Sequence, residues 1–365
     1  MERKKINFIC MDLGINGGTK SILSIADALT NQGHEVNVIY PKYACPNIFN
    51  KNTLVEGIGM PIMRLKRELT NKSVSKDTIA MFKPICNVIQ VPSLTEEHIP
   101  DADYVFATWW ETAAYVKKLS SSKGKKCYLI QHYEVWGGKP DKVKQTYKEG
   151  FVNIVHSNWL QNNIVLETGA KVAANISHCP EHKDFYDTGL KNTTPELKVM
   201  MIYRNIDWKG MADGIEAFET CIKSSDIKAK LILVGEKPNF ELKEYMEFYE
   251  HPNTASLRWH YNQADIFLFP SWNEGFGLPP MEAMCCGTVV VTTDVGAIPD
   301  YAQDRETALL SPPKNSSRLA INLDRAMRDA GLRTQLANNA KHFMEYYTWE
   351  RYATKLMEVL TKEDK

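Results

Sequence analysis

The sequence predicts an α/β protein made of two Rossmann-like domains, each with a parallel sheet. Short apolar runs alternate with longer amphipathic runs, which is typical of strands followed by crossover helices. This alternation starts twice, once near residue 5 and again near residue 198. The length of 365 residues also provides enough chain for two domains with separate cores. We therefore expect two domains facing a cleft, with ligand at the carboxyl ends of their strands.

The first half of the chain predicts strands that are each followed by a helix. Ile6–Met11 has the pattern of a strand, and after a glycine-rich loop a helix covers Lys20–Gln32. Gly33 ends that helix, as glycine commonly does. The region from about Ala44 to Val91 has no clear period, so we assign no elements there. The later strands are expected at Val36–Tyr40, Tyr104–Ala107, Lys126–Gln131 and Asn153–His156.

A polar stretch at residues 184–196, DFYDTGLKNTTPE, predicts a linker between the halves. We therefore expect domains over residues 1–190 and 191–348, followed by a helical segment over 349–365. The strands expected after the linker are Lys198–Tyr203, Lys230–Val234, Asp265–Phe269 and Thr288–Thr292. The helices expected there are Met211–Lys223, Ser316–Ala330, Leu332–Tyr346 and Trp349–Leu360.

Composition and charge exclude several classes of protein. The 44 basic and 44 acidic residues give a formal net charge of zero, which argues against a nucleic-acid-binding protein. The eight cysteines form no C-x-x-C pair, which is typical of reduced thiols in the cytoplasm. Asp12 interrupts the first apolar run too early for a signal peptide, and we expect no membrane-spanning segment. Two basic runs, Arg64–Lys76 and Lys117–Lys126, are compatible with a solvated surface or with peripheral contact to an anionic membrane.

The most informative stretch is Ser271–Asp300, with the sequence SWNEGFGLPPMEAMCCGTVVVTTDVGAIPD. A glycine-rich loop follows an apolar strand, and a helix begins near Pro279, since proline suits the first helical turn. Backbone amides at such a loop and helix start form an anion site. Glu282 lies about one turn into the helix, eight residues after Glu274. A carboxylate at that place is suited to the vicinal hydroxyls of a ribose whose phosphates bind the amides.

The spacing of Glu274 and Glu282 in this context resembles the signature of the family 4 retaining glycosyltransferases, which have the GT-B fold. The similarity runs from about Lys198 to Pro313. The resemblance implies transfer of a hexosyl or deoxyhexosyl group from a nucleoside diphosphate to a hydroxyl acceptor, without a metal or other cofactor. The acceptor would be a glycan or a lipid-linked group in bacterial cell-surface polysaccharide or glycolipid synthesis. A C-terminal helix would return to the first domain.

The resemblance also implies roles for individual residues of the second domain. Glu282 would hold the ribose, and Glu274 the sugar hydroxyls near the reacting carbon. Arg204 and Lys209, in the sequence YRNIDWKG, would bind the diphosphate, whose negative charge grows as the sugar–oxygen bond breaks. Backbone groups that contact the donor phosphates are expected at Gly275, Phe276, Gly277 and Leu278.

In the first domain, Gly17 and Gly18 follow the first strand and match the family's donor-side glycine loop. His132 ends a later strand, at the position where the family contacts the donor sugar near the reacting carbon, although a buried structural histidine is the other interpretation. Neighbouring residues are suited to a sugar or acceptor pocket because aromatic faces suit sugar rings, although such residues also serve packing. These are Trp109, Tyr133, Glu134 and Trp136.

Several alternatives stay open. Asp101 and Asp103 form a D-x-D pattern that binds metal in the other major transferase fold, but they precede a strand and are more typical of a loop. The first loop differs from G-x-G-x-x-G. The second strand ends in Tyr40 and Pro41, without the acidic residue that would hold the ribose of NAD, and so a dehydrogenase is disfavoured. A 2-epimerase, a phosphorylase or a non-catalytic sugar-nucleotide-binding subunit are the alternative functions. The donor base, whether in UDP, GDP or dTDP, is undetermined.

Overall fold

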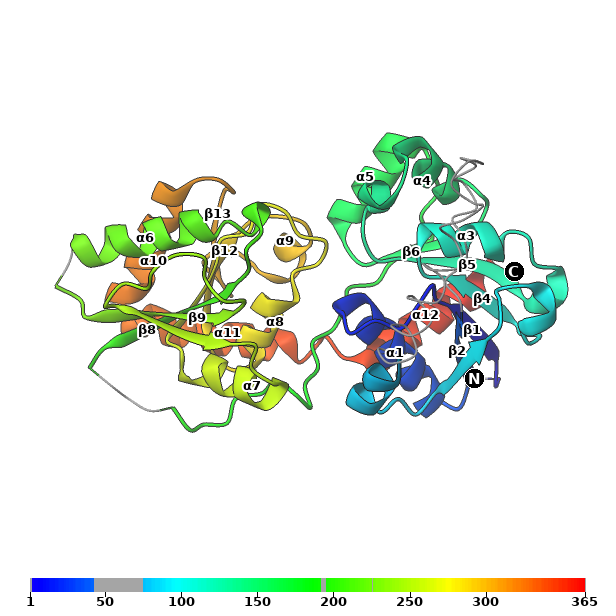
Figure 1. Cartoon of the computed structure of the whole chain (residues 1–365), viewed down its shortest axis with the longest axis horizontal. Coiled ribbons are helices and arrows are strands. Elements are labelled where there is room, and N and C mark those ends of the chain that lie inside the picture. The colour runs from blue at the N-terminus through cyan, green and yellow to red at the C-terminus, as the bar shows by residue number, and fades with distance from the viewer. Residues whose placement is uncertain (1, 43–74, 192–194, 225, 365) are drawn as a thin grey trace, which may run out of the picture. The chain divides into compact units, whose positions relative to one another are not determined.

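The computed structural model describes residues 2–42, 75–191, 195–224 and 226–364, which form two compact units (Figure 1). Unit 1 contains the chain up to His178 together with Trp349–Lys365, and unit 2 contains Cys179–Thr348. The sequence prediction placed the division after residue 190, whereas unit 2 already begins at Cys179. The α/β class with two parallel-sheet domains is confirmed.

Unit 1 is built on a seven-stranded sheet in the order β3-β2-β1-β4-β5-β6-β7. All its strand pairs are parallel, and the order reverses where β1 pairs with β2 on one side and β4 on the other. The central strands are almost wholly apolar and buried, as expected where helices cover both faces of a parallel sheet. The strands are β1 (Lys5–Ile9), β2 (Glu35–Pro41), β3 (Asn87–Val91), β4 (Tyr104–Ala107), β5 (Lys125–Ile130), β6 (Val152–Val155) and β7 (Ala174–Asn175).

The last helix of the chain, α12 (Trp349–Glu363), belongs to unit 1 and packs on α1 (Gly17–Asn31). Its buried side is apolar, and Gln32 Nε2 donates to Glu350 O and Thr354 Oγ1, both at 2.9 Å. The return of this helix to the first domain, expected from the family resemblance, is confirmed. The other helical elements of unit 1 include η1 (Glu96–His98), α3 (Trp110–Val116), η2 (Ser121–Lys123), η3 (Glu134–Gly137), α4 (Pro140–Tyr147) and α5 (Asn158–Thr168).

Unit 2 is built on a six-stranded sheet in the order β10-β9-β8-β11-β12-β13, also with parallel pairs. The strand order reverses between β8 and β11. The strands are β8 (Leu197–Tyr203), β9 (Ala229–Gly235), β10 (Met246–Glu250), β11 (Ile266–Phe269), β12 (Val289–Thr293) and β13 (Leu309–Ser311).

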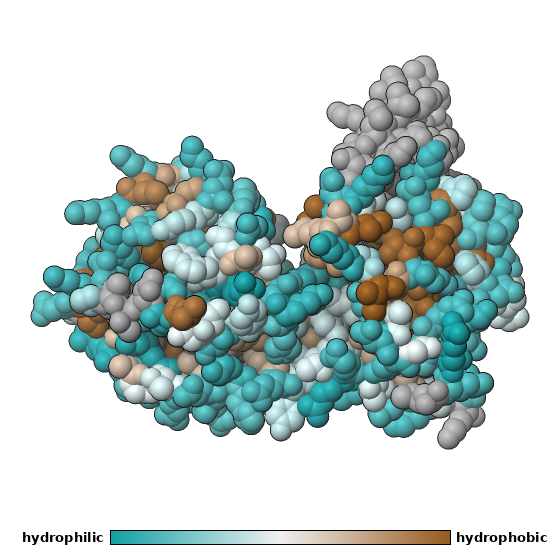
Figure 2. Space-filling model, turned by 90° about the horizontal axis from the view of Figure 1, so that it is seen from below, coloured by the Kyte–Doolittle hydropathy of each residue, from teal (hydrophilic) through white to brown (hydrophobic). Residues whose placement is uncertain are grey.

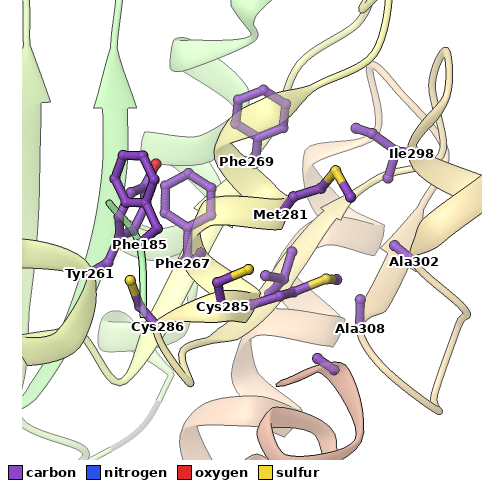
Figure 3. Close-up of a cluster of buried hydrophobic side chains, with 14 of the residues drawn as sticks. Phe185, Tyr261, Phe267, Phe269, Met281, Cys285, Cys286, Ile298, Ala302 and Ala308 are labelled. Carbon is purple, nitrogen blue, oxygen red and sulfur yellow. The ribbon is translucent and has the colours of Figure 1, made fainter. Parts of the chain in front are cut away.

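Helices of unit 2 fix the loops at the carboxyl ends of its strands. One group packs α6 against α10, and another packs α8 against α7 and α11. Figure 3 shows Phe267 and Phe269 of β11 with Met281 and Cys285 of α8 in one buried cluster, which holds α8 on the sheet. The helical elements include η4 (Asp207–Lys209), α6 (Met211–Lys223), α7 (Thr254–Gln263), α8 (Leu278–Cys285), α9 (Ile298–Tyr301), α10 (Ser316–Arg328) and α11 (Ala330–Met344).

The surface of the described residues bears on the predicted membrane contact. Figure 2 shows apolar residues gathered over part of unit 1, on the right, whereas the visible face of unit 2 is mostly polar. Most of the basic run Arg64–Lys76 lies outside the described residues. In the run Lys117–Lys126, Lys123 pairs with Asp101 at 2.8 Å and Lys125 with Asp364 at 3.2 Å. Within the described part of the chain, no helix has the length and apolar character needed to cross a membrane.

Candidate functional site

The reversal of strand order in unit 2 places two functional loops side by side. One loop follows β8 and carries Arg204 and Lys209, and the other follows β11 and carries Glu274. In open α/β sheets, ligands bind outside the carboxyl ends of the strands at such a reversal. The fold of unit 2 therefore brings these three predicted residues to the same edge of its sheet.

Backbone contacts fasten the two loops of unit 2 to each other. Trp272 N donates to Trp208 O at 2.7 Å, and Ser271 Oγ donates to the same carbonyl at 3.1 Å. Gly210 has φ +65°, and a Cβ there would lie 2.0 Å from Pro270 O, so glycine is required for this close approach. The contacts fix the position of Lys209 relative to the loop after β11.

Lys209 and Glu274 form an ion pair with 2.7 Å between Nζ and Oε1. The side chain of Glu274 is 10% exposed and that of Lys209 is 25% exposed, so the pair is largely shielded from solvent. Shielding strengthens the interaction between the two charges. The pair links the residue expected to bind phosphate with the residue expected to bind sugar hydroxyls.

Arg204 is oriented by a carboxylate that the sequence prediction did not include. Its Nη1 donates to Glu236 Oε1 at 2.9 Å, and Glu236 Oε2 accepts from Asn205 N at 2.9 Å. These bonds, the amide of Asn205 first, lower the pKa of Glu236. Glu236 directly follows β9, so the guanidinium is held by a residue from the neighbouring strand. A diphosphate that binds Arg204 would compete with Glu236 for the guanidinium group.

A cavity of about 730 Å³ adjoins Arg204, and its size is within the range of small-molecule sites. The residues around it come from the end of β8, the start of α6 and the segment before β10. Lys209, Glu274 and Glu282 are not among its lining residues, so this cavity gathers only part of the predicted donor site. Lining residues include Arg204, Asp207, Met211, Phe240 and Trp272.

The start of α8 has the geometry of an anion site. Gly277 caps the helix with φ +79°, and Leu278 is its first residue, followed by two prolines. Leu278 supplies the amide of the first turn, at the positive end of the helix dipole, because Pro279 and Pro280 carry no N–H. The ring of Phe276 stacks on Tyr301, with 5.4 Å between centroids, and is 9% exposed. Phe276 therefore offers a ligand its backbone, while its side chain belongs to the core.

Glu282 is half-buried, one turn inside α8, and its Oε2 accepts from Tyr261 OH at 3.1 Å. Tyr261 comes from α7 and is fully buried, and burial raises the pKa of its hydroxyl. A buried donor of this kind orients the carboxylate of Glu282. No local motif marks Tyr261, because it lies on a different helix from the residue that it orients.

Replacing Gly296 with alanine is expected to lower the free energy of unfolding by about 2–4 kcal/mol. It has φ +57°, and a Cβ there would lie 2.0 Å from Glu274 O. The next amide, Ala297 N, donates to Gly275 O at 3.2 Å, so the backbone cannot easily move away. Urea unfolding of the Gly296→Ala variant measures the effect.

The matched control for this substitution is Gly189→Ala. Gly189 has φ +66°, but an added Cβ would meet no atom within 4 Å. The control should therefore cost only the backbone strain, about 1–2 kcal/mol. Equal losses in the two variants would contradict a contact between the Gly296 position and the Glu274 loop.

Unit 1 brings its own predicted residues together at the carboxyl edge of its sheet. Asn16 caps α1 by accepting from Thr19 N at 2.9 Å, and Gly17 and Gly18 are the first residues of the helix. A Cβ on Gly18 would lie 3.5 Å from Gln131 Oε1, so the glycine loop borders the residue before His132. The loops after β1 and β5 are therefore adjacent in unit 1.

His132 lies among aromatic rings in unit 1. Trp136 Nε1 donates to His132 Nδ1 at 3.2 Å, and the Trp136 ring lies 5.4 Å from that of Trp109. A third indole, Trp159 at the start of α5, meets the imidazole edge-on, with 5.8 Å between centroids. The sequence prediction missed Trp159, although it comes just after a predicted strand end. The Tyr133 ring instead stacks on Tyr147.

Glu134 lies inside unit 1, although the sequence suggested a place in the sugar or acceptor pocket. Its side chain is 1% exposed, and its Oε2 accepts from Trp110 N and Tyr128 OH, both at 2.7 Å. Burial raises the pKa of this carboxyl to about 8. Glu134 therefore acts on its neighbours by holding the segment after His132, rather than by touching a ligand.

The D-x-D pattern lies at the amino end of β4, the opposite edge of the sheet from His132. Asp103 Oδ2 accepts from Lys5 N at 2.7 Å, which joins the starts of β1 and β4. Asp101 Oδ1 accepts from Lys123 Nζ at 2.8 Å. Both carboxylates therefore have structural contacts at the end of the sheet where ligands are not expected.

Comparison with known proteins relates residues 183–343 to the family model of the glycosyl transferases group 1. An uncharacterized glycosyltransferase of Methanocaldococcus jannaschii, MJ1607, is 24% identical over 92% of this chain and 91% of its own. The phosphatidyl-myo-inositol mannosyltransferase of Mycolicibacterium smegmatis is 23% identical over 97% of this chain and 93% of its own. A D-inositol 3-phosphate glycosyltransferase of Streptomyces bingchenggensis is 35% identical, but over only 27% of this chain and 22% of its own.

Solved structures show the same fold over nearly the whole chain. Sucrose-phosphate synthase from Thermosynechococcus elongatus has a TM-score of 0.69 at 19% identity, covering 99% of both chains. Anabaena Alr3699/HepE in complex with UDP has a TM-score of 0.74 at 14% identity, covering 98% of this chain and 100% of its own. The two-domain GT-B architecture expected from the sequence is confirmed.

Proposed function

We propose that the protein is a group 1 glycosyl transferase that moves a sugar from a nucleoside diphosphate to an acceptor hydroxyl, and the match of residues 183–343 to that family model supports this. The observation that carries the proposal is the shielded Lys209–Glu274 pair at the carboxyl edge of unit 2. One partner is suited to a phosphate oxygen and the other to sugar hydroxyls. A sugar phosphate carries both kinds of group next to each other.

In this proposal, unit 2 holds the donor through four kinds of contact. Lys209 and Arg204 bind the diphosphate, together with the amides of the glycine-rich loop before α8 and of Leu278. Glu282, oriented by Tyr261, accepts from the ribose hydroxyls. Glu274 accepts from hydroxyls of the transferred sugar. Gly17 and Gly18 of unit 1, like His132, keep the donor-side roles that the family resemblance gives them.

We propose that the reaction retains the configuration at the sugar carbon and needs no metal. The bond between the anomeric carbon and the phosphate oxygen breaks, and its electron pair stays on the departing diphosphate. The acceptor oxygen bonds to the same carbon on the face that the diphosphate leaves, and its proton passes to a phosphate oxygen. Fixed cations stabilise the charge that develops on the leaving group. Glu274 is paired with Lys209, which supports a role in binding rather than as a nucleophile.

The class of acceptor is also part of the proposal, and the family resemblance supports it. We propose transfer of a hexosyl or deoxyhexosyl group to a glycan or lipid-linked acceptor in cell-surface polysaccharide or glycolipid synthesis. Relatives support this class: one is named for phosphatidyl-myo-inositol, and the solved structure of WaaG is described as involved in lipopolysaccharide biosynthesis.

Replacing Glu282 with alanine is expected to weaken diphosphate binding about 10- to 100-fold, because charge-assisted hydrogen bonds contribute about 1.5–3 kcal/mol. Thermal shifts of the purified protein with UDP, GDP, dTDP and ADP provide the measurement. One diphosphate should raise the melting temperature in a concentration-dependent way.

Glu345→Ala is the control for the Glu282 substitution, since Glu345 is an exposed carboxylate at the end of α11. It should bind the diphosphate as the unmodified protein does. The proposed function fails if no diphosphate shifts the melting temperature, or if Glu282→Ala binds it equally well. Release of an altered sugar nucleotide without acceptor would indicate an epimerase instead.

A further inference from the structure

We propose that Trp109, Trp136 and Trp159, which are grouped around His132, form an aromatic platform that binds a sugar ring of the acceptor. The acceptor is then a glycan recognised through its carbohydrate, rather than through a lipid tail or a phosphate. This inference rests on the proposed function, because it names the acceptor class of the same enzyme. It concerns unit 1 alone.

The central ring of the platform is exposed and yet held in place. Trp136 is 70% exposed, although an indole is a large apolar group that is usually well buried. Its Nε1 donates to His132 Nδ1, and its ring lies against Trp109. A ring fixed in this way loses little conformational freedom when a ligand binds, and so more of the contact energy appears as affinity.

The backbone beneath the platform is shaped to fit the indoles. A Cβ on Gly137 would lie 2.5 Å from Trp109 Cζ2, and a Cβ on Gly138 would lie 2.7 Å from Trp110 Cζ2. Only glycine allows both approaches, so the loop packs directly on the two rings. Glu134 anchors the same loop by accepting from Trp110 N and Tyr128 OH. The loop that carries Trp136 is therefore held in place by packing against Trp109 and Trp110 and by the hydrogen bonds of Glu134.

The platform also lies where the topology of unit 1 places ligands. Trp109 follows β4, His132 follows β5 and Trp159 follows β6, and these three strands are neighbours in the sheet. The carboxyl ends of parallel strands meet at one edge, which is the ligand-binding edge of such sheets. Three separate loops thus contribute aromatic rings to one place.

The chemistry of the platform suits a sugar ring. The face of a pyranose presents C–H groups with small positive charges, which pack well on the negative face of an indole, while its hydroxyls project from the rim. His132 adds a polar group beside the rings. An acyl chain would instead require an enclosed apolar groove, and a phosphate would require several converging amides or cations.

Saturation-transfer NMR of the full-length protein tests this proposal. The probes are the methyl α- and β-glycosides of glucose, galactose, mannose, rhamnose and N-acetylglucosamine, with their linear trisaccharides. At least one probe should receive saturation on its ring C–H protons. The signal should fall at least fivefold in Trp136→Ala and should be largely kept in Trp136→Phe, which preserves an aromatic face.

Trp259→Ala is the matched control, because Trp259 is a 50% exposed indole of unit 2 that also contacts a histidine ring. It should bind the sugar probe as the unmodified protein does. The proposal is overturned if no sugar probe receives saturation, or if Trp136→Ala keeps the signal. Diphosphate-induced thermal shifts of the same variants separate the two hypotheses: a normal shift without sugar binding leaves the proposed function intact and removes only the platform.

Discussion

Replacing Lys209 with alanine is expected to lower kcat/KM for sugar transfer by about 10²- to 10³-fold, or about 3–4 kcal/mol of transition-state stabilisation. The diphosphate gains negative charge as the bond to the sugar breaks, so a cation fixed beside it binds the transition state more tightly than the ground state. Lys209 is fixed by the loop contacts to Trp272 and by its pair with Glu274. Because such an interaction strengthens in the transition state, kcat should fall more than KM rises.

Loss of Lys209 also leaves Glu274 as a shielded carboxylate without its ion-pair partner, and so stability must be measured beside activity. The double variant with Glu274→Gln removes that penalty, and it should regain stability without regaining turnover. Lys223→Ala is the control, because Lys223 is an exposed lysine that pairs with Glu219 on α6. Near-normal turnover of Lys209→Ala in a folded protein would remove this residue from the mechanism.

Replacing Glu134 with glutamine is expected to remove a pH dependence of stability worth about 3–5 kcal/mol, since each pKa unit corresponds to about 1.4 kcal/mol. Burial raises the pKa of Glu134 to about 8 in the folded protein, whereas its ordinary value is 4.5. Between these values the folded state holds a proton that the unfolded state has lost. The free energy of unfolding should therefore fall as the pH rises from about 4.5 to 8.

Calorimetric melting at several values between pH 5 and 9 measures this effect, and hydrogen exchange of the peptide around β5 assigns it to unit 1. Glutamine imitates the protonated acid, so Glu134→Gln should flatten the curve. Glu167→Gln is the control, because Glu167 is a carboxylate at the surface of the same unit, paired with Lys144. An unchanged slope in Glu134→Gln would mean that the carboxyl is ionised in the folded state.

The sequence predicted the centres of both sheets better than their edges. The central strands are apolar runs because both of their faces are buried, and such runs are easy to recognise. The missed strands lie at the four sheet edges, where side chains are partly exposed or strands are short. They are β3, β7, β10 and β13.

The sequence points to candidate site residues in loops that follow strands, but it does not reveal the partners that come from elsewhere in the chain. Arg204, Lys209 and Glu274 lie in such loops, and the structure brings them to one edge. Glu236 and Tyr261 orient predicted residues from other elements, so no spacing rule reveals them. Glu134 followed a strand in the expected way, but local sequence does not show that its side chain turns into the core.

The return of α12 to unit 1 has a consequence for the order of biosynthesis. Unit 2 is continuous in sequence, so all of its residues are available to fold before α12 is translated. The part of α1 that contacts α12 is covered only after α12, which follows unit 2 in the chain, has been made. During translation, unit 1 therefore exposes apolar side chains to solvent and to chaperones for as long as unit 2 is being made.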